Sequence, residues 1–271
     1  MGKTTITKHR IPEIDILRGV AVFLMIFDHF MYDIWGLMPF VFSDFPNVNG
    51  LSWNIVSLAA HYWFMPLRTV ARYVVLFVFL SLTGICCSFS KSNLKRGSKL
   101  LGLAYLLTLA TYFIGDIIGD SELLISFGVL HCISLALIII GLIEKKISSK
   151  WFYLCVAVVM ISLGIYFKSI EQIVSYREKN ILVLTIEQIV GISYCGSDCF
   201  PFLLNGGQIF LGVFIGKHFY SDKKSLFNLK YKNNLLTFVG RNSLPVYFAH
   251  QVIIPVLLFI TLLLFGFSIA M

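Results

Sequence analysis

Ionisable residues lie inside an apolar stretch near the start of the chain, over residues 14–38. Arg18 is followed, ten and eleven positions later, by Asp28 and His29. This spacing is about three turns of an α-helix, so the side chains share one stripe, with about 16 Å between them along the axis. A neutral imidazole accepts protons near neutral pH, and a guanidinium pairs well with phosphate. The pattern predicts proton transfer at one end of a helix and phosphate binding at the other.

Two further apolar stretches carry a histidine. His131 lies within residues 128–133, and His250 follows Arg241 in the last stretch. Ionisable groups are costly in hydrocarbon, so those found there are candidates for function. Three helices with a histidine at similar predicted depth indicate a buried polar centre. The alternatives are an ion-pair ladder that orients the first helix, a packing role for His131, and a kinked polar helix contact at Pro245.

Composition places these residues in a membrane. Of 271 residues, 58% are hydrophobic and 13% are charged, whereas soluble domains are about 45–50% apolar and about 25% charged. A soluble fold of this length could not bury so much apolar surface, but a membrane span takes up about 20 apolar residues. The sequence therefore predicts an all-α fold, a polytopic transmembrane helix bundle of about seven spans, in a single domain over residues 1–271.

The predicted spans are seven apolar stretches: 14–38, 67–90, 100–118, 122–143, 151–168, 200–220 and 235–270. The last stretch is long enough to hold an interfacial helix near 232–240, followed by a span that begins at Ser243. Two moderately apolar segments, 40–66 and 181–199, are predicted to be re-entrant or interfacial pieces.

Basic residues predict the orientation, because cytoplasmic loops carry an excess of Lys and Arg. With residues 1–10 in the cytoplasm, the inner loops hold about three times as many basic residues as the outer ones. Lys95 and Lys223 then face the cytoplasm, Asp120 and Arg177 face outside, and the C-terminus is extracytoplasmic. The formal charge of +8 follows from these loops and requires no nucleic acid.

Cysteines give little sign of a metal site. Cys195 and Cys199 lie on a predicted outer segment, where both a disulfide and two free thiols stay open. The other cysteines fall in apolar helices and are expected to pack there. No histidine lies near the outer pair, so no metal is predicted.

Four segments carry a resemblance to a known family. They are Glu-Ile-Asp-Ile-Leu-Arg-Gly-Val-Ala with Met-Ile-Phe-Asp-His-Phe-Met-Tyr-Asp (13–33), Gly-Val-Leu-His-Cys-Ile (128–133), Asp-Cys-Phe-Pro-Phe-Leu (198–203, with Gly212 and Gly216 beyond), and Gly-Arg-Asn-Ser-Leu through His-Gln (240–251). In this order they are similar to the heparan-alpha-glucosaminide N-acetyltransferase catalytic-domain family in its short prokaryotic form. That family belongs to a superfamily of transmembrane acyltransferases.

The resemblance implies an enzyme that moves an acyl group, usually acetyl, from cytoplasmic acyl-CoA to an acceptor at the membrane or outside. In related membrane acyltransferases, a histidine eleven residues after an arginine is essential, and Arg18 and His29 have this spacing. We expect His29 to act as general base or to carry the acyl group briefly. Asp28 or Asp33 would orient it, and Arg18 and Arg241 would bind the CoA phosphates.

The remaining polar residues are assigned to the acceptor side. His131, Asn242, His250 and Gln251 are expected to line the reaction centre, and His61 is a second candidate base. The acceptor is expected to be an amine or hydroxyl on a glycan or glycolipid. Heparan itself is not expected, since the chain is shorter than the eukaryotic heparan enzymes and shows no large lumenal domain. N- and O-acylation, longer acyl groups and a homodimer stay open.

Two other classes of protein fit the same residues. A transporter or channel would use them as a proton or solute path. Such a fold favours an inverted repeat with broken helices at matching positions, and the sequence shows no repeat, although Pro245 and Gly206-Gly207 could break helices. A structural membrane subunit without chemistry is the third class. Binding of acetyl-CoA to the purified protein would separate the enzyme from both.

Overall fold

The computed structural model describes residues 10–42, 44–45, 50–118, 124–173, 180–194 and 198–269. Residues 1–9, which form most of the predicted cytoplasmic segment, lie outside this part of the chain. Asp120, Arg177 and Cys195 lie outside it too, so the predicted sides of Asp120 and Arg177 stay predictions, and the choice between a disulfide and two free thiols at Cys195 and Cys199 stays open.

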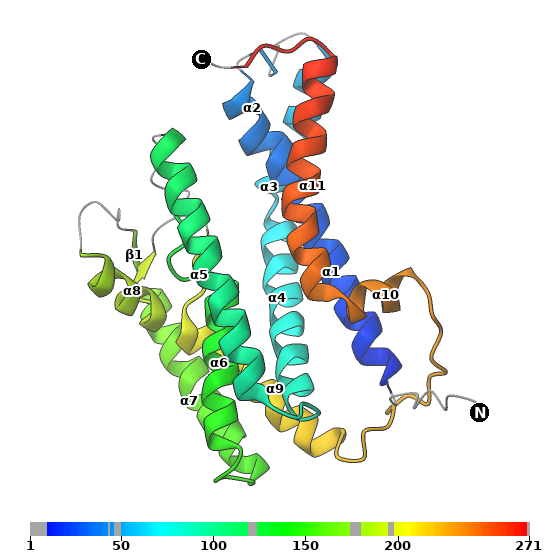
Figure 1. Cartoon of the computed structure of the whole chain (residues 1–271), viewed down its shortest axis with the longest axis vertical. Coiled ribbons are helices and arrows are strands. Elements are labelled where there is room, and N and C mark those ends of the chain that lie inside the picture. The colour runs from blue at the N-terminus through cyan, green and yellow to red at the C-terminus, as the bar shows by residue number, and fades with distance from the viewer. Residues whose placement is uncertain are drawn as a thin grey trace. The chain divides into compact units, whose positions relative to one another are not determined.

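Each of the seven apolar stretches contains a helix (Figure 1). The first stretch forms α1, which continues through a π-helical turn, η1, into the short helix α2. The helices are α1 (Pro12–Tyr32), η1 (Asp33–Leu37), α2 (Met38–Val41), α4 (Pro66–Cys87), α5 (Asn93–Ile118), α6 (Val129–Ile143), α7 (Lys150–Ser169), α9 (Phe202–Phe219) and α11 (Ser243–Leu264). Within η1 the Met38 N–H donates to the carbonyl of Asp33, five residues back, which is the π-helical pattern.

The apolar helices confirm the predicted helical membrane bundle. Among the described helices, α4, α5, α7 and α11 are each long and apolar enough to cross a membrane, and α6 is a shorter apolar helix. Many large apolar side chains on them are exposed in the isolated chain, as Ile117 is at 83%. Lipid covers such surface, and a helix satisfies its own backbone hydrogen bonds there. The protein is therefore an integral membrane protein; the count of seven spans stays a prediction.

The shorter elements fall where the sequence suggested interruptions. They are α3 (Leu51–Trp63), β1 (Gln172–Ile173), α8 (Ile181–Val190), β2 (Ser193–Tyr194) and α10 (Leu235–Arg241), with β1 and β2 paired in parallel. The short helix α10 followed by a span from Ser243 confirms the predicted division of the last stretch. Pro245, which the sequence offered as a possible helix break, lies at the start of a helix instead. Pro245 lies in the first turn of α11, where its missing N–H costs no helical bond, and the helix breaks at Asn242 instead.

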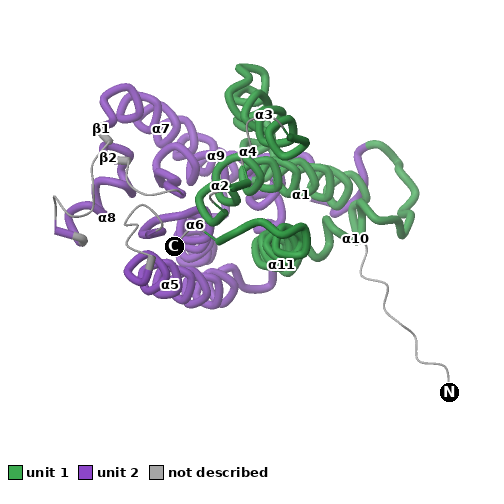
Figure 2. The backbone as a smooth tube through the Cα atoms, turned by 90° about the horizontal axis from the view of Figure 1, so that it is seen from above, with its two compact units in different colours: residues 1–79, 227–271 green, residues 80–226 purple. Residues whose placement is uncertain are grey.

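The chain divides into two compact units (Figure 2). One is formed by residues 1–79 and 227–271 and is called the terminal unit here; the other, residues 80–226, is called the central unit. The terminal unit contains α1, α3, α10 and α11, and a core of Ile34, Met38 and Phe42 packs against Leu262. The central unit is built on the pairs α5–α6 and α7–α9. The expectation of a single domain stays a prediction.

Small residues let helices pack closely within the terminal unit. A Cβ on Gly19 of α1 would overlap the carbonyl of Leu236 on α10, and a Cβ on Gly240 would overlap the carbonyl of Asp15. Such contacts between backbones are typical of membrane helices, which pack by close approach instead of by the hydrophobic effect. The two backbones therefore touch at Gly19 and Gly240, where a larger residue would not fit.

The predicted orientation can be tested by cysteine labelling. In a background without native cysteines, Lys95→Cys and Lys223→Cys are expected to react with an impermeant maleimide only after cells are permeabilised. Lys95 lies in the first turn of α5 and Lys223 in the segment after α9, both in lysine-rich stretches predicted to face the cytoplasm. Lys168→Cys, at the end of α7 assigned to the outside, should react in intact cells. Labelling at position 95 in intact cells would overturn the orientation.

Candidate functional site

Two histidines from distant parts of the chain meet in the terminal unit. The imidazole rings of His29 on α1 and His250 on α11 lie 5.1 Å apart between centroids, edge to face. His29 Nδ1 is 2.8 Å from the carbonyl oxygen of Met25, one turn earlier. A carbonyl oxygen only accepts, so Nδ1 must carry the proton in this arrangement. His29 Nε2 then holds the lone pair that a general base needs.

The ring of His250 has one nitrogen without a hydrogen-bond partner among the described residues. The residue is 6% exposed, and its Nδ1 lies 3.4 Å from the carbonyl oxygen of Val246. Its Nε2 is buried and has no hydrogen-bond partner among the described residues. The ring of Tyr247 packs against His250, and Gln251 donates to the Tyr247 hydroxyl at 3.2 Å. Buried polar atoms usually have a partner, so His250 Nε2 is a position at which a substrate group can bind.

Asp28 is held by Arg68, which lies at the start of the predicted span 67–90. Arg68 Nε and a terminal nitrogen donate to the two Asp28 carboxylate oxygens at 2.7 and 2.6 Å, and the Tyr62 hydroxyl donates to one of them at 3.0 Å. The guanidinium also stacks 3.6 Å from the centre of the Trp63 ring. Burial, and then the nearby Asp28 charge, raise the pKa of the Tyr62 phenol, so it remains a donor. These bonds hold Asp28 toward α3 and α4.

Asp33 is the acidic residue that shares a helix face with His29. It follows His29 by four residues, which places both on one side of the helix, and the Asp33 N–H donates to the His29 carbonyl. Asp33 is 8% exposed. Of the two acids suggested as orienting groups, Asp33 therefore has the more suitable position. His61 is exposed on α3.

The two candidate phosphate-binding arginines flank the crossing of α1 and α10. Arg18 precedes Gly19, and Arg241 follows Gly240, and these glycines let the two backbones touch. The Arg241 guanidinium lies 5.7 Å from the centre of the Phe238 ring. The expected approach of the two guanidinium groups stays a prediction.

Asn242 lies next to Arg241, between α10 and α11. Its side-chain amide donates to the Phe238 carbonyl at 2.9 Å. In the structure this side chain therefore holds the turn between the two helices, and its expected role beside the acceptor stays a prediction.

His131 lies in the central unit, in the first turn of α6. The sequence predicted it to be about nine residues deep in a helix, but α6 begins only at Val129. Its Nε2 lies 3.2 Å from the Thr108 hydroxyl, and the Gly128 N–H donates to its Nδ1 at 3.3 Å. With 2% exposure, His131 has the contacts of a satisfied packing residue that caps a helix.

A search for metal ligands adds no further group. In the described part of the chain, no three His, Cys, Asp or Glu side chains are placed to hold a metal ion. The absence of a metal stays a prediction.

The comparison with known families decides the classification. The family model described as "Heparan-alpha-glucosaminide N-acetyltransferase, catalytic" matches residues 10–252. The chain belongs to this family. No curated protein and no solved structure matches it. The heparan-alpha-glucosaminide N-acetyltransferase family implies an acetyltransferase that works in the membrane, with acetyl-CoA as the acetyl donor.

The four segments that resemble the heparan-alpha-glucosaminide N-acetyltransferase family meet in pairs. Segments 13–33 and 240–251 meet in the terminal unit, through the helix crossing and the paired histidines. Segments 128–133 and 198–203 meet in the central unit, where a Cβ on Gly128 would lie 2.5 Å from an Asp198 carboxylate oxygen. Each unit therefore contains one pair of family segments.

Arg68 and Tyr62, which hold Asp28, were not among the site residues predicted from the sequence. Arg68 is forty positions from Asp28 and looked like an ordinary basic residue at the outer end of a span. The available signal was local. Arg68 follows the aromatic run Tyr62-Trp63-Phe64 by four residues, and an arginine beside such rings often stacks on one of them.

Proposed function

We propose that the chain transfers an acetyl group from acetyl-CoA to an amine or hydroxyl of a sugar-containing acceptor at the membrane. The observation that carries this proposal is the paired histidines: His29, with Nδ1 bound to a backbone carbonyl, and His250, with a buried free Nε2, lie 5.1 Å apart in the terminal unit. Family membership supports the reaction class. The donor would enter from the cytoplasm, and the acceptor would lie outside.

The paired histidines suit direct transfer. His29 Nε2 takes the proton of the acceptor hydroxyl, or of an ammonium group that must become a neutral amine. The acceptor oxygen or nitrogen then attacks the thioester carbonyl and forms the new C–O or C–N bond. The C–S bond breaks, and the CoA thiolate takes the proton from the imidazolium. A nitrogen acceptor releases its second proton to water as the amide forms. In neutral His250, Nδ1 donates to the Val246 carbonyl, so Nε2 is an acceptor that would hold an O–H or N–H of the acceptor molecule in place.

A covalent route uses the same atoms. His29 Nε2 attacks the thioester carbonyl, the C–S bond breaks, and CoA leaves as the thiolate, which takes a proton from water. The acceptor then attacks the acylated imidazole, the C–N bond to His29 breaks, and the proton of the acceptor is released to water. Single-turnover measurements separate the two routes, because only the covalent route releases CoA before an acceptor is added. The experiment that tests the function itself is release of the CoA thiol from acetyl-CoA by purified protein in membranes that contain the acceptor.

Arg18 and Arg241 are proposed to bind the CoA phosphates. Replacing either arginine by Ala is expected to weaken CoA binding by roughly 1.5–3 kcal/mol, the range for loss of a hydrogen bond to a charged group. Isothermal titration of the purified variants with CoA measures this loss. The matched control is Arg72→Ala, an exposed arginine on α4 that should bind CoA like the unaltered protein. Unchanged affinity in both Arg18→Ala and Arg241→Ala would exclude them from the donor site.

A further inference from the structure

The terminal unit contains an exposed segment, residues 227–234, that forms neither helix nor strand and leads into α10. It is called the basic strap here. Its apolar side chains alternate with polar ones and are exposed, and Phe227 is the most exposed of them, at 69%. On α10, which follows, Phe238 is exposed as well. Exposed aromatic and leucine side chains beside lysines are the composition of segments that lie in a membrane surface.

The basic strap lies at the end of the terminal unit from which α11 enters the membrane. Only α10 separates it from Ser243, where α11 begins, and α11 is long and apolar enough to span a bilayer. The Tyr231 hydroxyl donates to the Asp15 carboxylate at 3.3 Å, which joins the strap to the first turn of α1. Both α1 and α11 run away from this end of the unit (Figure 1). In either orientation of the chain, the strap therefore lies beside lipid headgroups.

Charges at this end of the terminal unit are separated by sign. The two acids in the first turn of α1 are buried, and Asp15, the one beside the strap, also pairs with Arg10 at 3.4 Å. Lys230 and Lys232 are exposed, and neither takes part in a salt bridge between described residues. Residues 227–241 contain no acid. The exposed charge of the strap is therefore positive, and it attracts a negatively charged surface.

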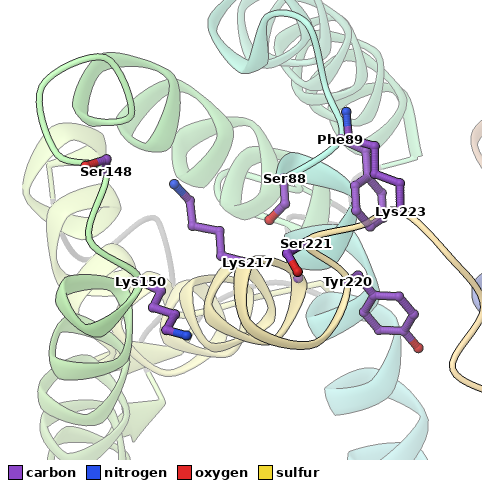
Figure 3. Close-up of a pocket in the computed structure, with 9 residues that line it drawn as sticks. Ser88, Phe89, Ser148, Lys150, Lys217, Tyr220, Ser221 and Lys223 are labelled. Atoms are coloured by element: carbon purple, nitrogen blue, oxygen red, sulfur yellow. The ribbon is translucent and has the colours of Figure 1, made fainter.

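The lysine-rich end of α9, in the central unit, differs in this respect. Lys217 and Lys223 line a pocket of about 330 Å³ there (Figure 3). Asp222, the neighbour of Lys223 in sequence, is exposed and accepts a hydrogen bond from the Ser221 hydroxyl at 3.5 Å. The positive charge of that pocket therefore has an acid beside it, whereas the basic strap has none of its own.

We propose that the basic strap binds the headgroups of anionic phospholipids, with its apolar side chains inserted below the headgroups and Lys230 and Lys232 on the phosphates. Phosphatidylcholine carries a positive choline beside each phosphate, so only a lipid with net negative charge attracts the lysines in this way. One lysine near an anionic membrane surface strengthens binding about fivefold, and two strengthen it about thirtyfold. Arg18 and Arg241, which are assigned to the donor, take no part, so this inference is independent of the proposed function.

The test is fluorescence quenching by brominated lipids in nanodiscs of phosphatidylcholine. In a background without native cysteines, bimane is attached at Asn233→Cys, an exposed position within the strap. Brominated phosphatidylglycerol is expected to bind beside it about thirtyfold more strongly than brominated phosphatidylcholine. In the double variant Lys230→Gln/Lys232→Gln the two lipids should quench alike. Quenching by neither lipid would show that the strap lies in water and would contradict the proposal.

The matched control is Lys145→Gln/Lys146→Gln, which removes two exposed lysines from the turn after α6 in the central unit. It is expected to keep the preference for phosphatidylglycerol. Equal losses in the two double variants would assign the preference to overall charge and exclude the strap as its source.

Native mass spectrometry of the chain with all its cysteines is a second measurement. In detergent with equal amounts of the two lipids, phosphatidylglycerol is expected to be the lipid that stays bound, and Lys230→Gln/Lys232→Gln is expected to lose it. Equal binding of the two lipids to the unaltered chain would overturn the proposal.

Discussion

His29→Gln is expected to lower acetyl transfer by about 10²-fold or more, while the protein still inserts and still binds acetyl-CoA. Glutamine keeps a donor that can reach the Met25 carbonyl, so the helix loses little, but it has no basic nitrogen to replace His29 Nε2. A hydroxyl or ammonium acceptor then keeps its proton, and attack on the thioester slows. Release of the CoA thiol by purified variants in membranes measures the effect.

Other histidines serve as the comparison for this result. His250→Gln is expected to cost less, because His250 is proposed to position or polarise the substrate without taking its proton. His131→Gln is also expected to cost less, since His131 is bound to Thr108 and to the Gly128 N–H. Near-normal turnover in His29→Gln would remove this residue from the mechanism and direct attention to His61 or His131. If none of the variants inserts, the histidines are structural.

Arg68→Ala is expected to lower the free energy of unfolding by about 3–5 kcal/mol, the usual cost of breaking a buried ion pair from one side. The side chains of Arg68 and Asp28 are 7% and 20% exposed, so Asp28 would stay inside the protein without its cation. The contact between the guanidinium and Trp63 would be lost as well. Unfolding in a denaturing detergent series, followed by tryptophan fluorescence, measures the change.

Two variants separate the ion pair from a general effect of removing arginine. Arg72→Ala, one turn later on α4 and exposed, should change stability by no more than about 0.5 kcal/mol. Asp28→Asn in the Arg68→Ala background should recover part of the loss, since it removes the uncompensated charge. Equal losses in Arg68→Ala and Arg72→Ala would show that the Asp28 pair contributes little.

The positions of the helices were predictable where apolar residues form a continuous stretch of sequence. Hydropathy located a helix in each of the seven stretches, but it placed some ends poorly. α5 begins at Asn93, earlier than the predicted residue 100, because its first turns contain Lys95, Arg96 and Lys99. A helix continues through such residues in water, whereas a search for apolar runs stops at them. The start of α6 was placed too early for the opposite reason, since apolar residues before Gly128 do not join the helix.

The candidate site was predictable where its residues share one helix and less so where they do not. The spacing from Arg18 to His29 follows from helical geometry alone. The contact between His29 and His250 depends on how α1 packs against α11, and the sequence suggested it only through similar predicted depth. No comparable pattern in the sequence pointed to the hydrogen bonds from Arg68 to Asp28. Long-range pairs form where the packed helices bring them together, and a single sequence does not give that packing.

The π-helical turn at Asp33–Leu37 affects how the sequences of related proteins should be aligned with this chain. A π-turn is one residue inserted into an α-helix, which the helix absorbs as a bulge. A homologue with one residue fewer here would run on as a uniform α-helix, and its later side chains would keep their directions, because the bulge takes up the extra residue. Trp35, which stacks on Trp63 with 5.7 Å between the ring centroids, lies within the turn itself. Sequence alignments of such homologues should place the gap inside this helix and leave the following loop at full length.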